Sequence, residues 1–217
     1  APVGVLPQSV GLVIGTLLPV AALVYASWKV RKPYLIALVG LTFPFIDLCA
    51  YGNLDWMVLL GLLNINALSP FLLTVKPQAG ALAVVAQLGK MKGKSWREYA
   101  RVFGPFLVIA PVMLLVFPGF IGYMTTFNVR LTEVSTFSLF PYSLPLVPPL
   151  LWLAYRRADP LYGVLASLCI SPYFLFHSIV PALFLIAQRN WKWGLAANLL
   201  TWGIVALVLL DVITFSF

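Results

Sequence analysis

The sequence predicts an all-α, polytopic integral membrane protein with about seven to ten transmembrane or broken helices joined by short loops. Three observations support this fold class. The mean hydropathy of +0.99 is far above that of an ordinary soluble domain. Only 9% of the residues are charged, while 62% are hydrophobic. The apolar runs do not alternate in the way that strands would. We therefore expect a single transmembrane helical domain over residues 1–217.

The basic residues indicate how the helices are oriented. Twelve of the fourteen lysines and arginines fall in four short segments beside apolar runs. These segments are residues 29–33, 90–101, 156–157 and 189–192. Cytoplasmic loops of membrane proteins carry such an excess of Lys and Arg, so we place all four segments on the cytoplasmic side. Although the net charge is +8, this placement argues against nucleic acid as a partner.

With the basic segments inside, the first half of the chain follows in order. Residues 6–28 predict a first span that runs inward, and residues 33–49 predict one outward span. Residues 54–63 and 68–75 are too short to cross a bilayer and are bounded by Gly, Asn, Ser or Pro. They predict short or broken helices. Residues 79–88 then return inward.

The second half begins with the basic segment, in which Ser95 and Glu98 have the spacing of a capping box at a helix start. The longest external loop is expected at residues 118–134. The remaining spans alternate in direction and are expected at residues 102–117, 135–155, 160–170, 173–188 and 193–213.

Lys76 lies between two apolar runs and is followed by Pro77 and Gln78. A lysine at membrane depth is costly and marks either a site or a buried ion pair. The proline breaks the helix at the same point, and broken backbone at this depth must be satisfied by protein or water. The region 50–80 is therefore expected to line a cavity. One interpretation is that Lys76 binds a lipid phosphate; the other is a salt bridge to Asp47 or Asp55.

Two carboxylates, Asp47 and Asp55, flank a turn that contains Gly52 and Asn53. Asp55 is expected near the N-terminus of a short helix, where the helix dipole favours negative charge. In a functional interpretation, a carboxylate here orients a sugar hydroxyl or acts as a general base. In a structural interpretation, Asp55 only caps a helix and Asp47 pairs with a cation.

His177 is the single histidine and lies in an apolar stretch near the expected outer face. It is either a hydrogen-bonded packing residue or part of a site. Arg130, in the external loop, either pairs with Glu133 or binds a phosphate. Cys49 and Cys169 are interpreted as small buried hydrophobic residues. With one histidine and two distant cysteines, we expect no metal site and no cofactor.

The segments 52–56 and 73–78, followed by Trp96 and Arg97, resemble glycosyltransferase family 87. The resemblance covers roughly residues 35–180 and extends to the Ser-Pro-Tyr and His177 segment. That family is similar to the GT-C class of polytopic enzymes, which take sugars from polyprenyl-phosphate donors. The resemblance implies that Lys76 holds the donor phosphate and that Asn53 and Asp55 shape the sugar or acceptor site. Gln78 is expected among the substrate-binding residues. It also implies an inverting reaction with an acidic base, for which Asp55 and Asp47 are the candidates.

The chain departs from that family in one respect. GT-C enzymes are expected to carry an acidic residue in the first external loop, but no acid precedes Asp47. The family is also longer, and the start at Ala1 has no basic region of the kind found in signal peptides. We therefore expect either missing upstream spans or a scaffold without the chemistry.

The leading hypothesis is a GT-C-like glycosyltransferase, or a fragment of one, in a bacterial cytoplasmic membrane. Its expected partners are membrane lipids, a polyprenyl-phosphate sugar and other membrane subunits. A non-enzymatic subunit of a larger membrane complex is the alternative, because the chain is short and many of its spans are interrupted by proline. A small transporter is the third hypothesis, although no internal repeat is visible.

Overall fold

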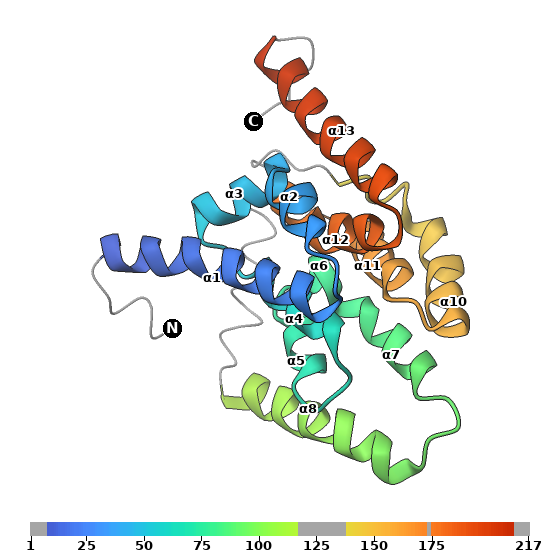
Figure 1. The fold of residues 1–217 in the computed structure, drawn as a ribbon. Coiled ribbons are helices and arrows are strands. Elements are labelled where there is room, and N and C mark those ends of the chain that lie inside the picture. Colours follow the sequence, from blue (N-terminus) through green and yellow to red (C-terminus); the bar gives the residue numbers. More distant parts are fainter. Residues whose placement is uncertain (1–7, 117–137, 173–174, 211–217) are drawn as a thin grey trace.

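The computed structural model describes residues 8–116, 138–172 and 175–210. Every regular element in these residues is a helix. Three are long and apolar enough to cross a membrane: α1 (Gln8–Lys29), α8 (Trp96–Val116) and α13 (Trp191–Leu209). In Figure 1, α8 and α13 lie at opposite edges, and the shorter helices are gathered between them. The predicted fold class, an all-α membrane protein, is confirmed.

The long helices expose large apolar side chains, as a lipid environment requires. On α8, for example, Leu107 and Leu115 are 66% and 79% exposed. Such a surface would be unfavourable in water, because the free energy falls when apolar surface is removed from water. The protein is therefore embedded in a membrane.

The span expected at residues 33–49 is not one continuous helix. The structure has two helices here, α2 (Tyr34–Gly40) and α3 (Phe43–Tyr51), bent by 77°. The bend arises because Thr42 acts as an N-cap, and its hydroxyl accepts a hydrogen bond from the Phe45 N–H at 3.3 Å. Pro44 follows in the first turn of α3, where its missing N–H costs little.

The stretch around Lys76 is divided into short elements. These are α4 (Asp55–Leu63), α5 (Ser69–Thr74), α6 (Pro77–Gly80), the 3₁₀ helix η2 (Ala81–Ala83) and α7 (Val84–Lys90). Lys76 has an extended backbone, with φ −130° and ψ 91°. A residue before proline avoids the helical region because its backbone would contact the proline ring. This local rule separates α5 from α6.

The expected span at residues 135–155 is shorter in the part that the structure describes. It consists of η3 (Leu144–Leu146) and α10 (Val147–Arg157). Pro148 and Pro149 fall in the first turn of α10, so the helix begins just before them. The remaining elements are α11 (Pro160–Ile170), η4 (Phe176–Ile179) and α12 (Val180–Arg189).

Small residues let these short helices approach closely. A Cβ atom at Gly163 of α11 would lie 2.5 Å from the Cα of Ala83 on η2. A Cβ atom at Gly89 of α7 would lie 2.2 Å from the carbonyl oxygen of Tyr155 on α10. Close backbone contact at glycine is a usual way of packing helices in membranes. Gly89 also places the C-terminal end of α7 beside that of α10.

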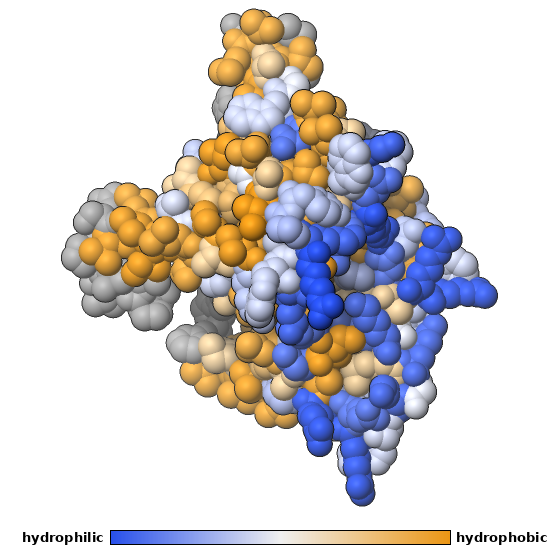
Figure 2. Space-filling model, in the orientation of Figure 1, coloured by the Kyte–Doolittle hydropathy of each residue, from blue (hydrophilic) through white to orange (hydrophobic). Residues whose placement is uncertain are grey.

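Charged and polar residues gather on one side of the molecule, which is blue in Figure 2. Lys32, Lys90, Arg157 and Arg189 come from the four basic segments, and all of them line one cavity. The segments therefore meet in space, although up to 157 residues separate them along the chain. We refer to this side as the basic face. Its assignment to the cytoplasm stays a prediction.

Candidate functional site

The candidate site lies well inside the molecule, far from the basic face. Gly52 contacts α1 at Gly15, where an added Cβ would be 3.1 Å from the Gly52 Cα. The Thr16 hydroxyl, next along α1, donates a hydrogen bond to the Cys49 carbonyl at 3.1 Å. Gly15 precedes the basic end of α1, Lys29, by fourteen residues. At the rise of an α-helix this separation is about 20 Å along the axis.

Lys76 forms an ion pair with Asp55. The distance from Lys76 Nζ to Asp55 Oδ2 is 2.5 Å, and the two side chains are 10% and 0% exposed. Asp55 is the first residue of α4, as expected, so its carboxylate lies near the positive end of that helix. Of the two interpretations of Lys76, the salt bridge is therefore present. It engages one of the three N–H donors of the ammonium group.

His177, on η4, contacts the second carboxylate. Its Nδ1 lies 2.7 Å from Asp47 Oδ2, while its Nε2 lies 2.6 Å from the Asn53 side-chain nitrogen. The Asn53 side-chain oxygen accepts from the Leu54 N–H at 2.9 Å, so the Asn53 amide presents its NH₂ group to the histidine. Nε2 must then be the acceptor, and Nδ1–H donates to Asp47. This pattern assigns a neutral imidazole with its proton on Nδ1.

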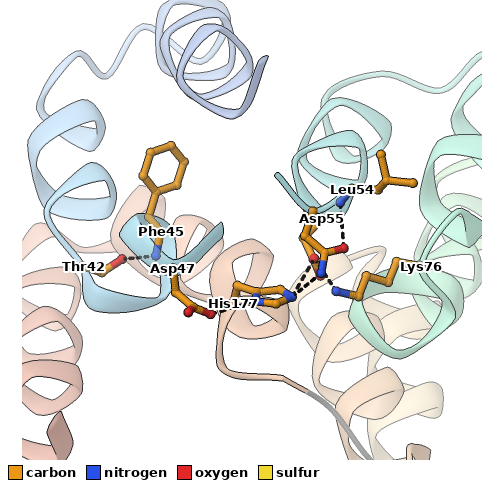
Figure 3. A network of polar contacts seen from close by, with 8 residues as sticks. Thr42, Phe45, Asp47, Leu54, Asp55, Lys76 and His177 are labelled. Carbon is orange, nitrogen blue, oxygen red and sulfur yellow. Dashed lines mark hydrogen bonds and ion pairs between the residues drawn. The ribbon is translucent and has the colours of Figure 1, made fainter. Parts of the chain in front are cut away.

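The two pairs join into one chain of contacts, shown in Figure 3. His177 lies between Asp47 on one side and Asp55 on the other, and its Nε2 is 3.6 Å from Asp55 Oδ2. We call Asp47, Asn53, Asp55, Lys76 and His177 the polar network. With a neutral histidine, its two carboxylates and one ammonium leave a net charge of −1.

One atom of the polar network is left without a partner among the described residues. The Asp55 Oδ1 atom is buried and makes no hydrogen bond. A buried oxygen of this kind normally has a donor, and its absence costs free energy. Asp47 differs, since its side chain is 17% exposed, more than those of Asp55, Lys76 and His177. A substrate that enters from outside the protein would therefore reach Asp47 more easily than Asp55.

The local sequence explains how these side chains reach one another. Gly52 ends α3 with φ +61°, a left-handed conformation that glycine adopts easily, and turns the chain toward α4. This turn brings Asp47 and Asp55, on consecutive helices, to the two sides of His177. Lys76 is held in the extended break before α6, and His177 arrives from η4 near the C-terminal end of the chain.

The structure brings together five of the seven predicted site residues, namely the members of the polar network. Gln78 does not join them: it is half-buried on α6 and makes no hydrogen bond to the network in the described residues. Arg130 lies outside the described residues. Sequence reasoning missed the contact of His177 with Asp47, because no local pattern links residues 130 positions apart.

The network can provide acid–base chemistry and charge, but the described residues hold no cluster of three or more His, Cys, Asp or Glu side chains suited to a metal ion. Comparison with protein-family models gave no match, and neither curated proteins nor solved structures matched the chain. The resemblance to glycosyltransferase family 87 therefore stays a prediction that rests on its motifs.

Proposed function

We propose that this chain is, or belongs to, a GT-C-like membrane glycosyltransferase that uses a polyprenyl-phosphate sugar donor. The observation that carries the proposal is the hydrogen bond between Asp47 and His177 in the interior of a membrane protein. Ionisable side chains are costly in a bilayer and usually serve a function there. An oriented carboxylate that is partly accessible is the group that an inverting transfer to a hydroxyl requires.

The depth of the polar network suits the outer leaflet of a multi-pass protein in a bacterial cytoplasmic membrane. With the basic face in the cytoplasm, a site about 20 Å away lies in the outer half of a hydrocarbon layer about 30 Å thick. A lipid-linked donor with its headgroup at the outer surface would meet the network from that side.

In the proposed reaction, Asp47 acts as the base. It takes the proton of the acceptor hydroxyl while the hydroxyl oxygen forms a bond to the anomeric carbon of the sugar. The bond from that carbon to the phosphate oxygen breaks, and polyprenyl phosphate leaves with the electron pair. The Nδ1–H of His177 holds Asp47 in position. The two N–H donors of Lys76 that Asp55 does not engage are proposed to contact the donor phosphate.

The experiment uses the full-length protein in lipid vesicles with labelled polyprenyl-phosphate sugars and measures sugar transfer. Asp47→Asn keeps the shape and one hydrogen-bonding oxygen but removes the base, so we expect the rate to fall about 10²–10⁴-fold. Lys192→Gln, on the basic face, is the matched control and should leave the rate unchanged. Transfer that survives Asp47→Asn, or no transfer from any such donor by the intact protein, would contradict the proposal.

A second candidate, a non-enzymatic subunit of a membrane complex, is favoured by one observation. Asp55 is fully buried and His177 is 2% exposed, so most of the network is closed to a substrate. If the network has only a structural role, the protein should neither bind nor transfer lipid-linked sugars. Co-purification with other membrane proteins in a fixed ratio, together with no transfer activity, would support this candidate.

A further inference from the structure

The cavity on the basic face contains more positive charge than the protein itself neutralises. It has a volume of about 570 Å³ and lies where α7, α10 and α12 end and α11 begins. Four cationic side chains line it, together with one carboxylate. These are Lys32, Lys90, Arg157, Arg189 and Asp159. The charges sum to +3, four positive and one negative.

The contacts within the cavity account for only part of this charge. Arg189 forms an ion pair with Asp159, and Lys32 donates to the Gln188 carbonyl at the end of α12. Lys90 is exposed and forms no ion pair in the described part of the chain. Lys32 and Lys90 both lie at the C-terminal end of a helix, where the negative end of the helix dipole offsets part of their charge. Neither of them has a carboxylate partner among the described residues.

The two arginines share one aromatic neighbour. Arg157 donates from Nη1 to the Tyr162 hydroxyl at 2.9 Å, and its guanidinium carbon lies 5.7 Å from the centre of the ring. The guanidinium carbon of Arg189 lies 5.6 Å from the same centre. Both guanidinium groups therefore lie within 5.7 Å of the same ring centre, and both line the cavity. An anion in the cavity that reaches both groups would accept hydrogen bonds from them and offset their charge.

Part of the lining is apolar. Leu62, Leu63, Phe184 and Leu185 contribute to the cavity, and the last two are buried in the protein core. An anion that also carries apolar groups satisfies both parts of this lining. Guanidinium groups match the oxygen geometry of phosphate, and basic pockets at the cytoplasmic ends of membrane helices suit lipid headgroups.

We propose that this cavity binds the phosphate group of an anionic lipid, with the lipid's glycerol and upper acyl carbons against the leucines. Arg157 and Arg189 hold the phosphate oxygens, and Lys90 supplies a further charge at the rim. This inference does not depend on the proposed glycosyltransferase activity. It concerns residues of the basic face, none of which belongs to the polar network.

The test measures lipid binding to the full-length protein in detergent by native mass spectrometry. Phosphatidylglycerol is titrated, with phosphatidylcholine as the zwitterionic control and inorganic phosphate as the soluble source of the same group. We expect phosphatidylglycerol to bind and the other two to bind at least tenfold more weakly. Arg157→Gln should weaken phosphatidylglycerol binding about tenfold, the loss of a hydrogen-bonded charge. Lys90→Gln should weaken it by a smaller factor.

Two control variants locate the site. Lys192→Gln removes a charge from the same face outside the cavity and should leave binding unchanged. Lys29→Gln alters a neighbouring cavity that Trp28 and Arg31 also line. If Lys29→Gln weakens binding while Arg157→Gln does not, the proposed site is wrong. If inorganic phosphate binds as tightly as phosphatidylglycerol, the lipid is not the ligand. A thermal unfolding scan of each variant excludes misfolding as the cause.

Discussion

The polar network and the basic cavity both collect charged side chains, but they treat the charges in opposite ways. In the network, each charge meets a partner from the chain itself, at 2.5 Å for Lys76 and Asp55 and 2.7 Å for His177 and Asp47. In the cavity, four cations face one carboxylate. The comparison teaches that buried charges are held by short contacts within the chain, even where a net charge of −1 is left, whereas exposed cations can stay available to a ligand. Substitutions should therefore affect stability in the first region and binding in the second.

The largest expected effect on stability belongs to Lys76→Met. This change leaves the fully buried Asp55 carboxylate without its cation. Removing one partner of a buried pair lowers the free energy of unfolding by about 3–5 kcal/mol. Unfolding in mixed detergent micelles measures it. The double variant Lys76→Met with Asp55→Asn removes both charges and should recover much of the loss; a double variant as unstable as the single one would contradict this.

His177→Phe should have the next largest effect. The ring keeps its approximate shape, but Asp47 and Asn53 each lose a hydrogen bond in a largely buried place. The expected loss in the free energy of unfolding is about 1–3 kcal/mol. The same unfolding measurement applies, with His177→Gln as the comparison because its amide keeps one polar contact. Equal stability of the His177→Phe variant and the original protein would show that the histidine is not integral to the network.

Arg189→Gln tests the cavity side of the comparison. Arg189 forms an ion pair with Asp159, but their side chains are 41% and 24% exposed. Solvent screens such a pair, so the free energy of unfolding should fall by no more than about 1 kcal/mol. Phosphatidylglycerol binding should fall more clearly than stability. A stability loss as large as that of Lys76→Met would make the two regions alike.

The smallest expected change in stability is that of Lys90→Gln. The side chain is exposed, and an exposed substitution of this kind changes the free energy of unfolding by about 0.5 kcal/mol or less. A measurable loss of lipid binding with an unchanged free energy of unfolding would show most clearly that the basic cavity serves binding and the polar network serves stability. Unchanged stability and unchanged binding together would remove Lys90 from the proposed site.

The long helices and the break at Lys76 could be predicted from the sequence, since each follows from a local rule. An apolar window of about 20 residues predicts a span, and proline after Lys76 predicts an interrupted helix. The 77° bend between α2 and α3 could not be predicted, because glycine and proline are also tolerated inside transmembrane helices. Thr42 was the available signal, as an N-cap residue placed before Pro44.

The members of the candidate site could be chosen from the sequence, but their partners could not. Asp47 and Asp55 were both possible partners of Lys76, and their positions in the sequence did not decide between them. The contact of His177 with Asp47 depends on how η4 packs against α3, which no spacing reveals. The basic segments predicted the orientation of the helices in the membrane. The cavity that these segments form together could not be predicted, because it depends on tertiary packing, including the close contact at Gly89.

The differing sequence separations inside the polar network impose an order on biosynthesis. Asp55 and Lys76 are 21 residues apart, whereas Asp47 and His177 are 130 apart. During translation the nascent chain therefore presents the lysine soon after the aspartate, and the two can enter the lipid as a neutral pair. Asp47 has no imidazole to meet until most of the polypeptide has been made. The packing of α3 against η4 can therefore form only after residue 177 has been synthesised.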